Sequence, residues 1–326
     1  VDDPEAARWK GSVERLAELE ALALAAIKPP ADDVVVPIGA RKHVFEASLI
    51  EMWVTTAKDG VVPINQRRER LRVLAQQELR RRCNGDDRWS EAGPLKTAIN
   101  KCWPTQKPVT LVDRYLPGPR GKQRAWTPAD QLLVDEANTL LNGTPFTYAH
   151  AVVDEAQDHS AVALRVIARR SPSGSMTLVG DVAQSTTPAG QERWADVFGH
   201  LGVSDDAGSI ADLTIGYRVP EPILQVANRL LPLTGVDATE SQSVRVEGDP
   251  PAWRIVTPTD LAASAAQVVR EVKHRHALTG VVAPLELHEP LAAALAGAGF
   301  AAVDHVHELE PVSYTHLTLP TNTVTW

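Results

Sequence analysis

Regularly spaced apolar residues in the first part of the chain predict helices. Apolar side chains recur every three or four residues over residues 4–27, which predicts an amphipathic helix that Pro29-Pro30 ends. Residues 65–82 have the same spacing and predict a second helix. The residues expected on the buried face of this second helix are Leu71, Leu74, Ala75 and Leu79.

A third predicted helix has clear signals at both ends. Thr127 suits the N-cap, Pro128 suits the first helical position, and Asp130 stands where the acid of a capping box is found. Asn142-Gly143 is a stop signal. Between the second and third helices, residues 102–124 are rich in Pro, Gly and basic side chains, which predicts a loop. Short strands are predicted at 34–36 and, inside that loop, at 109–112.

From Tyr148 onward, short apolar strands alternate with helical stretches. The predicted strands are 151–153, 176–179, 213–215, 253–256 and 281–283, and the predicted helices are 160–170, 191–201, 220–231, 259–277 and 285–296. This alternation indicates a parallel sheet with helices on both faces, so we expect an α/β fold. A second α/β unit is expected to begin near residue 233.

Length and composition narrow the class of protein. At about 150 residues per domain, 326 residues suggest about two domains. A chain with 44% hydrophobic and 23% charged residues is neither disordered nor fibrous. The formal net charge of −8 disfavours a grip on nucleic acid over the whole surface, so any such contact is expected to be local. Cys83 and Cys102 lack the spacing of a zinc site, and no apolar run is long enough for a membrane span.

One segment departs from this acidic character. Residues 65–82 contain seven Arg and two Glu, a local charge of +5. A solvated helix face explains such a stretch, and contact with a polyanion or a partner is the alternative.

Candidate chemistry lies where the first strand of the α/β region ends. Strand 151–153 runs directly into Asp154 and Glu155. In a parallel sheet, ligands gather at the carboxyl ends of strands. One carboxylate there can hold Mg²⁺ while its neighbour polarises an attacking water, which is the arrangement that phosphoryl transfer needs. Acids at this place also cap helices, so the pair alone is weak evidence.

Longer motifs make the case stronger. The string VVDEAQD at 152–158 resembles the Walker B motif of superfamily 1 helicases of the UvrD/Rep type. In the same order as in that family, MTLVGDVAQ at 176–184 resembles motif III and LTIGYRVP at 213–220 resembles motif IV. The resemblance implies a RecA-like P-loop NTPase motor core with a mostly helical insertion.

The resemblance also implies residue roles, ATP as the cofactor and Mg²⁺ as its metal. Asp154 would coordinate Mg²⁺, Glu155 would activate the hydrolytic water, and Gln184 would sense the γ-phosphate. Tyr217 would stack on adenine and Arg218 would stabilise charge on the γ-phosphate, since a guanidinium fork matches phosphate oxygens. The alternatives are a core aromatic at 217 and a surface cation at 218. Gln157 and Asp158 are expected to link the nucleotide site to motif III.

The segment after Gln184 bears on the branch of the family. UvrD/Rep helicases place aromatic residues there, on which single-stranded DNA bases stack. Here no aromatic residue precedes Trp194. The continuation TPAGQERW at 187–194, with NKCWP at 100–104 and AWTPAD at 125–130, is similar to the HelD-like branch, which acts on RNA polymerase. The resemblance covers residues 1 to about 311.

The chain also departs from the family pattern. No GxxxxGK[ST] loop occurs in it, and the later family motifs are missing. We expect a fragment whose phosphate loop precedes Val1 and whose far motifs follow Glu310, and which by itself neither hydrolyses ATP nor binds it tightly. The expected domains are a helical insertion (1–146), the later part of the first motor domain (147–232) and the start of the second (233–311). Residues 312–326 resemble a translated sequencing adapter and are expected to have no function.

Three functions remain open. The leading one is an ATP-dependent remodeller of RNA polymerase, expected to be a cytoplasmic, monomeric motor with no membrane partner. The second is a 3′–5′ DNA helicase that works on single-stranded DNA. The third is a non-enzymatic binding protein with a decayed ATP site.

Overall fold

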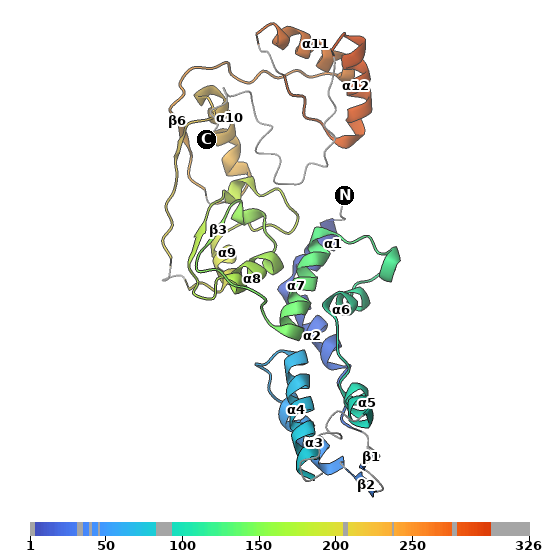
Figure 1. Ribbon diagram of the computed structural model, residues 1–326. Helices are drawn as coiled ribbons and strands as arrows, with labels where there is room; N and C mark the ends of the chain where they lie inside the picture. Colours follow the sequence, from blue (N-terminus) through green and yellow to red (C-terminus); the bar gives the residue numbers. More distant parts are fainter. Residues whose placement is uncertain are drawn as a thin grey trace. The chain divides into compact units, whose positions relative to one another are not determined.

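A computed structural model describes residues 4–30, 35–38, 41–44, 46–82, 93–204, 208–236, 238–275 and 279–300. The chain divides into two compact units, Val1–Gly208 and Ser209–Trp326, which are described separately (Figure 1). Cys83 and the 312–326 segment lie outside the described residues. The domain boundaries expected from the sequence stay predictions.

The first unit begins with helices α1 (Pro4–Gly11) and α2 (Leu16–Leu24), separated by a short 3-10 turn. The single helix predicted over this stretch is therefore wrong. Ser12 adopts extended backbone angles (φ −82°, ψ 126°), which ends α1. A Cβ at Gly11 would lie 2.9 Å from the Cβ of Ser160, so the glycine lets α1 approach the α/β region closely.

A hairpin and three helices follow. Strand β1 (Val35–Ile38) pairs antiparallel with β2 (Arg41–Val44). Helix α3 (Glu46–Ala57) packs on α4 (Ile64–Arg82), and α5 (Gly93–Cys102) comes next. Helix α4 confirms the prediction for residues 65–82, and three of its expected core residues are fully buried. Leu74 is 39% exposed, so its predicted burial is wrong: it lies on the stripe of α4 that faces an open groove beside α3.

Helix α6 (Pro108–Tyr115) corrects a further prediction, because a loop with a strand at 109–112 was expected. Pro108 stands at the start of the helix, where its missing N–H costs nothing. Leu111 and Val112 are buried, and α6 packs against α7 and α2. Burial on a helical face outweighs the β preference of the Val and Thr residues in this stretch.

Helix α7 (Pro128–Asn142) has the predicted ends. The Asp130 N–H donates to Thr127 Oγ1 at 3.3 Å, and the Thr127 N–H donates to Asp130 Oδ2 at 3.0 Å. This capping box satisfies two N–H groups that the helix start leaves unpaired. Gly143 ends the helix at φ 91°. A helical core runs through α2–α7, and Trp103 is its largest fully buried side chain.

The α/β part of the first unit is built on two strands. Strand β3 (Ala151–Val153) pairs in parallel with β4 (Met176–Leu178), as predicted. Helix α8 (Ala161–Arg170) begins at the predicted N-cap Ser160, whereas α9 (Trp194–Leu201) starts three residues later than predicted. Apolar residues of both helices pack with Val153 and Ala156. This parallel pair is smaller than a RecA-like sheet, so the RecA-like fold class stays a prediction.

The second unit also begins with a parallel pair, β5 (Ile215–Gly216) and β6 (Gln242–Ser243), connected through α10 (Glu221–Leu230). Helices α11 (Leu261–Lys273) and α12 (His288–Gly297) pack on each other. The strands predicted at 253–256 and 281–283 are wrong: both segments have no regular structure, and Ile255 is fully exposed. Their apolar side chains have no sheet neighbour among the described residues, so alternation alone does not create a strand.

Among the residues that the structure describes, no helix is both long and apolar enough to cross a membrane.

Candidate functional site

The predicted carboxylate pair lies at the carboxyl end of β3. The Val179 N–H donates to Val153 O (2.8 Å), and the Ala156 N–H donates to Val179 O (3.0 Å). These bonds hold the chain on both sides of Asp154 and Glu155 against the end of β4. Asp154 is exposed and Glu155 is half-buried, so both carboxylates stay within reach of a ligand.

Glu155 has an unusual backbone. Its φ of 48° and ψ of 46° place it in the left-handed region, and it is the only non-glycine residue among those described with a positive φ. The Glu155 N–H donates to Asp154 Oδ1 at 3.0 Å, which supports the turn. Such a conformation costs about 1–2 kcal/mol for a residue with a Cβ. A strained residue at a strand exit is a feature of functional sites.

Gln157 connects Glu155 to the segment after β4. Its side chain is 1% exposed, and its Nε2 donates to Glu155 Oε2 at 2.9 Å. Its Oε1 accepts the Asp181 N–H at 3.0 Å. One buried carboxamide therefore orients the Glu155 carboxylate and fixes the turn at Asp181. This is the link that the sequence predicted between 157 and motif III; its role in ATP turnover stays a prediction.

Two glycines make room for Gln157. A Cβ at Gly180 would overlap Gln157 Oε1 and lie 3.1 Å from the Ala156 N. A Cβ at Gly190 would lie 2.8 Å from Gln157 O. The backbone of both segments can approach Gln157 because these positions have no side chain.

Asp158 holds the segment that follows Gln184. Its Oδ1 accepts the Thr186 N–H at 2.9 Å, and its backbone oxygen accepts the Thr187 hydroxyl at 2.8 Å. The first aromatic residue after Gln184 is Trp194, which packs against the apolar cluster around Val153 and stacks on Phe198. The segment is therefore folded back on Asp158, and its first aromatic belongs to the core.

Gln184 itself is exposed, and its Nε2 donates to Asp181 Oδ2 at 2.7 Å. The other carboxylate oxygen of Asp181 accepts the Ala183 N–H at 2.9 Å. Sequence reasoning did not single out Asp181, Gly180 or Gln191. The position of Gly180-Asp181 directly after a strand was the available signal. Gln191 is buried, and its N–H donates to Gln157 O at 2.6 Å.

His159 closes this part of the site. Its backbone oxygen accepts from Gln191 Nε2 at 3.1 Å. Burial lowers the pKa of the His159 imidazole below its ordinary value, and the nearby Asp158 carboxylate opposes that effect in part.

Ion pairs attach α8 to the helical region. Arg169 contacts Glu136 (2.5 Å) and Asp135 (3.2 Å) of α7, and Arg170 also pairs with Asp135. These side chains are largely buried, so the network is little screened by salt. Helix α8, which follows the carboxylate pair, is thereby fixed to α7.

Tyr217 and Arg218 belong to the second unit, directly after β5. Tyr217 is 71% exposed, which excludes the alternative of a core aromatic. Arg218 is exposed as well, and its backbone oxygen accepts from Arg245 Nη1 at 2.6 Å. Both side chains are accessible to a ligand, and their roles toward ATP stay predictions.

The residues at the β3 exit fit a magnesium ion that a nucleotide brings with it. Mg²⁺ in nucleotide sites takes one or two carboxylates and completes its shell with waters and phosphates. Asp154 is exposed, and the structure gives its Oδ2 no hydrogen-bond partner. Within the described ranges, no group of three or more His, Cys, Asp or Glu side chains could hold a metal alone. Asp154 therefore suits a shared metal rather than a protein-only site.

Comparison with known proteins gives one partial likeness. No protein-family model matches the chain. The chain is similar to one subunit of the "ATP-dependent helicase/nuclease" of Oceanobacillus iheyensis, with 34% identity over 112 residues, which are 30% of this chain and 9% of that protein. The chain thus spans about a tenth of the relative's length. This likeness supports the resemblance to superfamily 1 at the level of the superfamily and does not distinguish the HelD-like branch.

Proposed function

We propose that the chain is part of a helicase-like motor that hydrolyses ATP. The observation that carries this proposal is the bridge made by Gln157 between the Glu155 carboxylate and the turn at Asp181. A motor needs its water-activating acid connected to the segment that senses the nucleotide. The name of the similar protein, which describes an ATP-dependent helicase/nuclease, agrees with this function.

In this proposal each residue acts through its own chemistry. Asp154 would hold Mg²⁺, which when bound neutralises phosphate charge. Glu155 would accept a proton from the attacking water, with its carboxylate held by Gln157. Gln184 and Arg218 would donate to the γ-phosphate, and the exposed ring of Tyr217 would stack on the base.

The test uses the longest open reading frame that contains this sequence. Its steady-state ATP hydrolysis is measured, together with nucleotide binding, for the wild type and for Glu155→Gln. The expected result is loss of turnover with binding retained. Unchanged turnover would remove Glu155 from the mechanism, and a wild type that neither binds nor hydrolyses ATP would favour the non-enzymatic binding protein.

For the target of the motor, we propose RNA polymerase. The absence of aromatic residues between Gln184 and Trp194 supports this target, because a base-stacking platform at that place would need them. The hydrogen bonds from Thr186 and Thr187 to Asp158 hold the segment against the protein and support the same conclusion.

A 3′–5′ DNA helicase is the second candidate, and the name of the similar helicase/nuclease favours it. One pair of measurements separates the two. ATP hydrolysis stimulated by purified RNA polymerase core enzyme, and not by single-stranded DNA, supports the polymerase remodeller. Stimulation by single-stranded DNA alone supports the helicase.

A further inference from the structure

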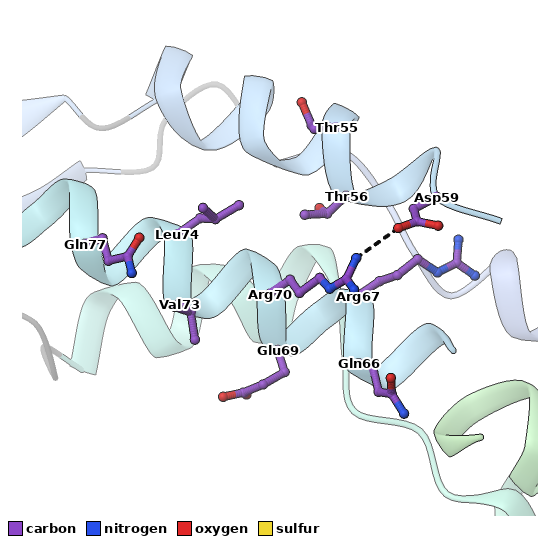
Figure 2. A pocket seen from close by; sticks show the side chains of 10 residues that line it. All are labelled: Thr55, Thr56, Asp59, Gln66, Arg67, Glu69, Arg70, Val73, Leu74 and Gln77. Atoms are coloured by element: carbon purple, nitrogen blue, oxygen red, sulfur yellow. Dashed lines mark hydrogen bonds and ion pairs between the residues drawn. The ribbon is translucent and has the colours of Figure 1, made fainter. Parts of the chain in front are cut away.

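A groove between α3 and α4 lies outside the candidate ATP site. It encloses about 560 Å³, and Figure 2 shows its lining side chains on the two helices. Arg67, Arg70, Leu74 and Gln77 follow one another at helical spacing, so they form one stripe of α4 along the groove. The ion pair between Arg70 and Asp59 (2.9 Å) lies at its rim, and both partners are partly exposed.

Arg67 is the unusual member of this lining. Its side chain is 5% exposed, and its Nη1 donates to Ala57 O (3.0 Å), the last residue of α3. This bond caps a helix end with a cation, which is favourable. The Arg67 Nε has no hydrogen-bond partner, and no ion pair forms between Arg67 and any residue that the structure describes. A buried guanidinium is costly unless an anion compensates its charge.

The unused part of Arg67 has a defined chemistry. With Nη1 occupied by Ala57 O, the donors left are Nε and Nη2, which form one edge of the guanidinium. That edge matches the two oxygens of a carboxylate. Asp59 and Glu69 also line the groove, and hydrogen bonding from Arg72 lowers the pKa of the Glu69 carboxyl, which favours its ionised form. A run of phosphates would meet both carboxylates, whereas a single carboxylate need only meet Arg67.

An apolar contact lies at a fixed distance from this edge. Leu74 is 39% exposed and follows Arg67 by seven residues, which is about 10 Å along a helix. Three residues of an extended peptide span about the same length. The groove therefore suits an extended segment with an acidic side chain three residues away from a leucine.

We propose that the α3–α4 groove binds an acidic, leucine-containing segment of a partner protein, with its carboxylate on the Nε–Nη2 edge of Arg67. This interaction does not depend on the proposed ATPase function. It also gives residues 65–82 a specific contact in place of a general attraction for polyanions.

The test uses the full 326-residue chain and a synthetic probe. The probe is the capped heptapeptide acetyl-Leu-Ala-Ala-Glu-Ala-Ala-Leu-amide, which has a leucine three residues from the acid in either chain direction. The matched control replaces its glutamate by glutamine. Binding is followed by the NMR signal of the Arg67 Nε–H, which is assigned by its loss in Arg67→Lys, and by calorimetry.

We expect the glutamate peptide to shift the Arg67 Nε–H signal and to bind about ten-fold or more tightly than the glutamine peptide. Arg67→Lys keeps a donor for Ala57 O but loses the two-pronged edge, so it should weaken binding by a similar factor. Arg81→Lys, at the far end of α4 and paired with Glu78, is the control that should bind as the wild type does.

Three outcomes would overturn the proposal. The two peptides could bind equally, which would show that the carboxylate is not recognised. Neither peptide could shift the Arg67 signal. Finally, an octathymidylate could shift it while the glutamate peptide does not, which would assign the groove to nucleic acid. The comparison of the two peptides on the wild-type chain decides the matter even if Arg67→Lys fails to fold.

Discussion

The buried side chain of Gln157 donates a hydrogen bond of 2.9 Å to the carboxylate of Glu155. The same side chain accepts the N–H of Asp181, so the exits of β3 and β4 share one carboxamide. A buried amide bonded at both ends has little freedom to move. The orientation of Glu155 and the path of the chain after β4 are consequently dependent on one residue.

Replacing Gln157 by Met should destabilise the 326-residue chain by about 1–3 kcal/mol, because the partners of its carboxamide lose their hydrogen bonds at a buried place. The measurement is urea denaturation followed by circular dichroism. Gln184→Ala, at an exposed position nearby, is the control and should change stability by less than about 0.5 kcal/mol. Equal effects of the two substitutions would contradict the importance of the bridge.

Gly180→Ala should also be destabilising, by about 1–3 kcal/mol, since the new Cβ would overlap Gln157 Oε1, and that side chain is fixed at both ends. Gly199→Ala is the matched control. No atom lies within 4 Å of the Cβ that it would gain, and it lies inside α9. Alanine there should stabilise the chain by up to about 1 kcal/mol. The two thermal midpoints should therefore move in opposite directions.

In the longest open reading frame, Glu155→Gln should lower the rate of ATP hydrolysis by at least about 100-fold, because the amide cannot accept the proton of the attacking water. Nucleotide binding, measured with a fluorescent ATP analogue, should stay within about two-fold of the wild type, since glutamine conserves the side-chain shape. Glu192→Gln, at an exposed position, is the control with unchanged turnover. A parallel loss in both variants would point to a general defect.

The stability of the chain should depend on pH through His159. Burial lowers the pKa of this imidazole in the folded state, so the unfolded state binds more protons near the ordinary histidine pKa of about 6.5. The free energy of unfolding should therefore fall as the pH drops below about 6.5. In His159→Gln this contribution is absent, so the urea midpoint should drop less between about pH 7.5 and about pH 5.5. An equal drop in both proteins would exclude His159 as the cause.

Local signals in the sequence predicted much of the structure near the candidate site. The Thr127–Asp130 capping box, the N-cap Ser160 and the parallel pairing of 151–153 with 176–178 are all present. Each of them depends on residues close in sequence or on a strong alternation of apolar strands and helices. The connection from 157–158 to the segment after β4 was also anticipated from the family resemblance, and hydrogen bonds of Gln157 and Asp158 provide it.

The failures have a common physical cause. Residues 109–112 and 253–256 are both rich in β-branched or aromatic side chains, and neither forms a strand. In the first case a buried helical face against α7 decides the outcome, and in the second no neighbouring strand is present among the described residues. Long-range packing made these choices, and the sequence pattern of a short segment does not contain it.

The left-handed backbone of Glu155 sets stability against chemistry at one position. Glycine adopts this conformation without the steric cost that every residue with a Cβ bears. A glycine at 155 would relax the turn, but it would also remove the carboxylate that Gln157 holds. Under selection for stability alone, this site would drift toward glycine. The glutamate in its place is therefore a sign of selection that acts on something other than folding.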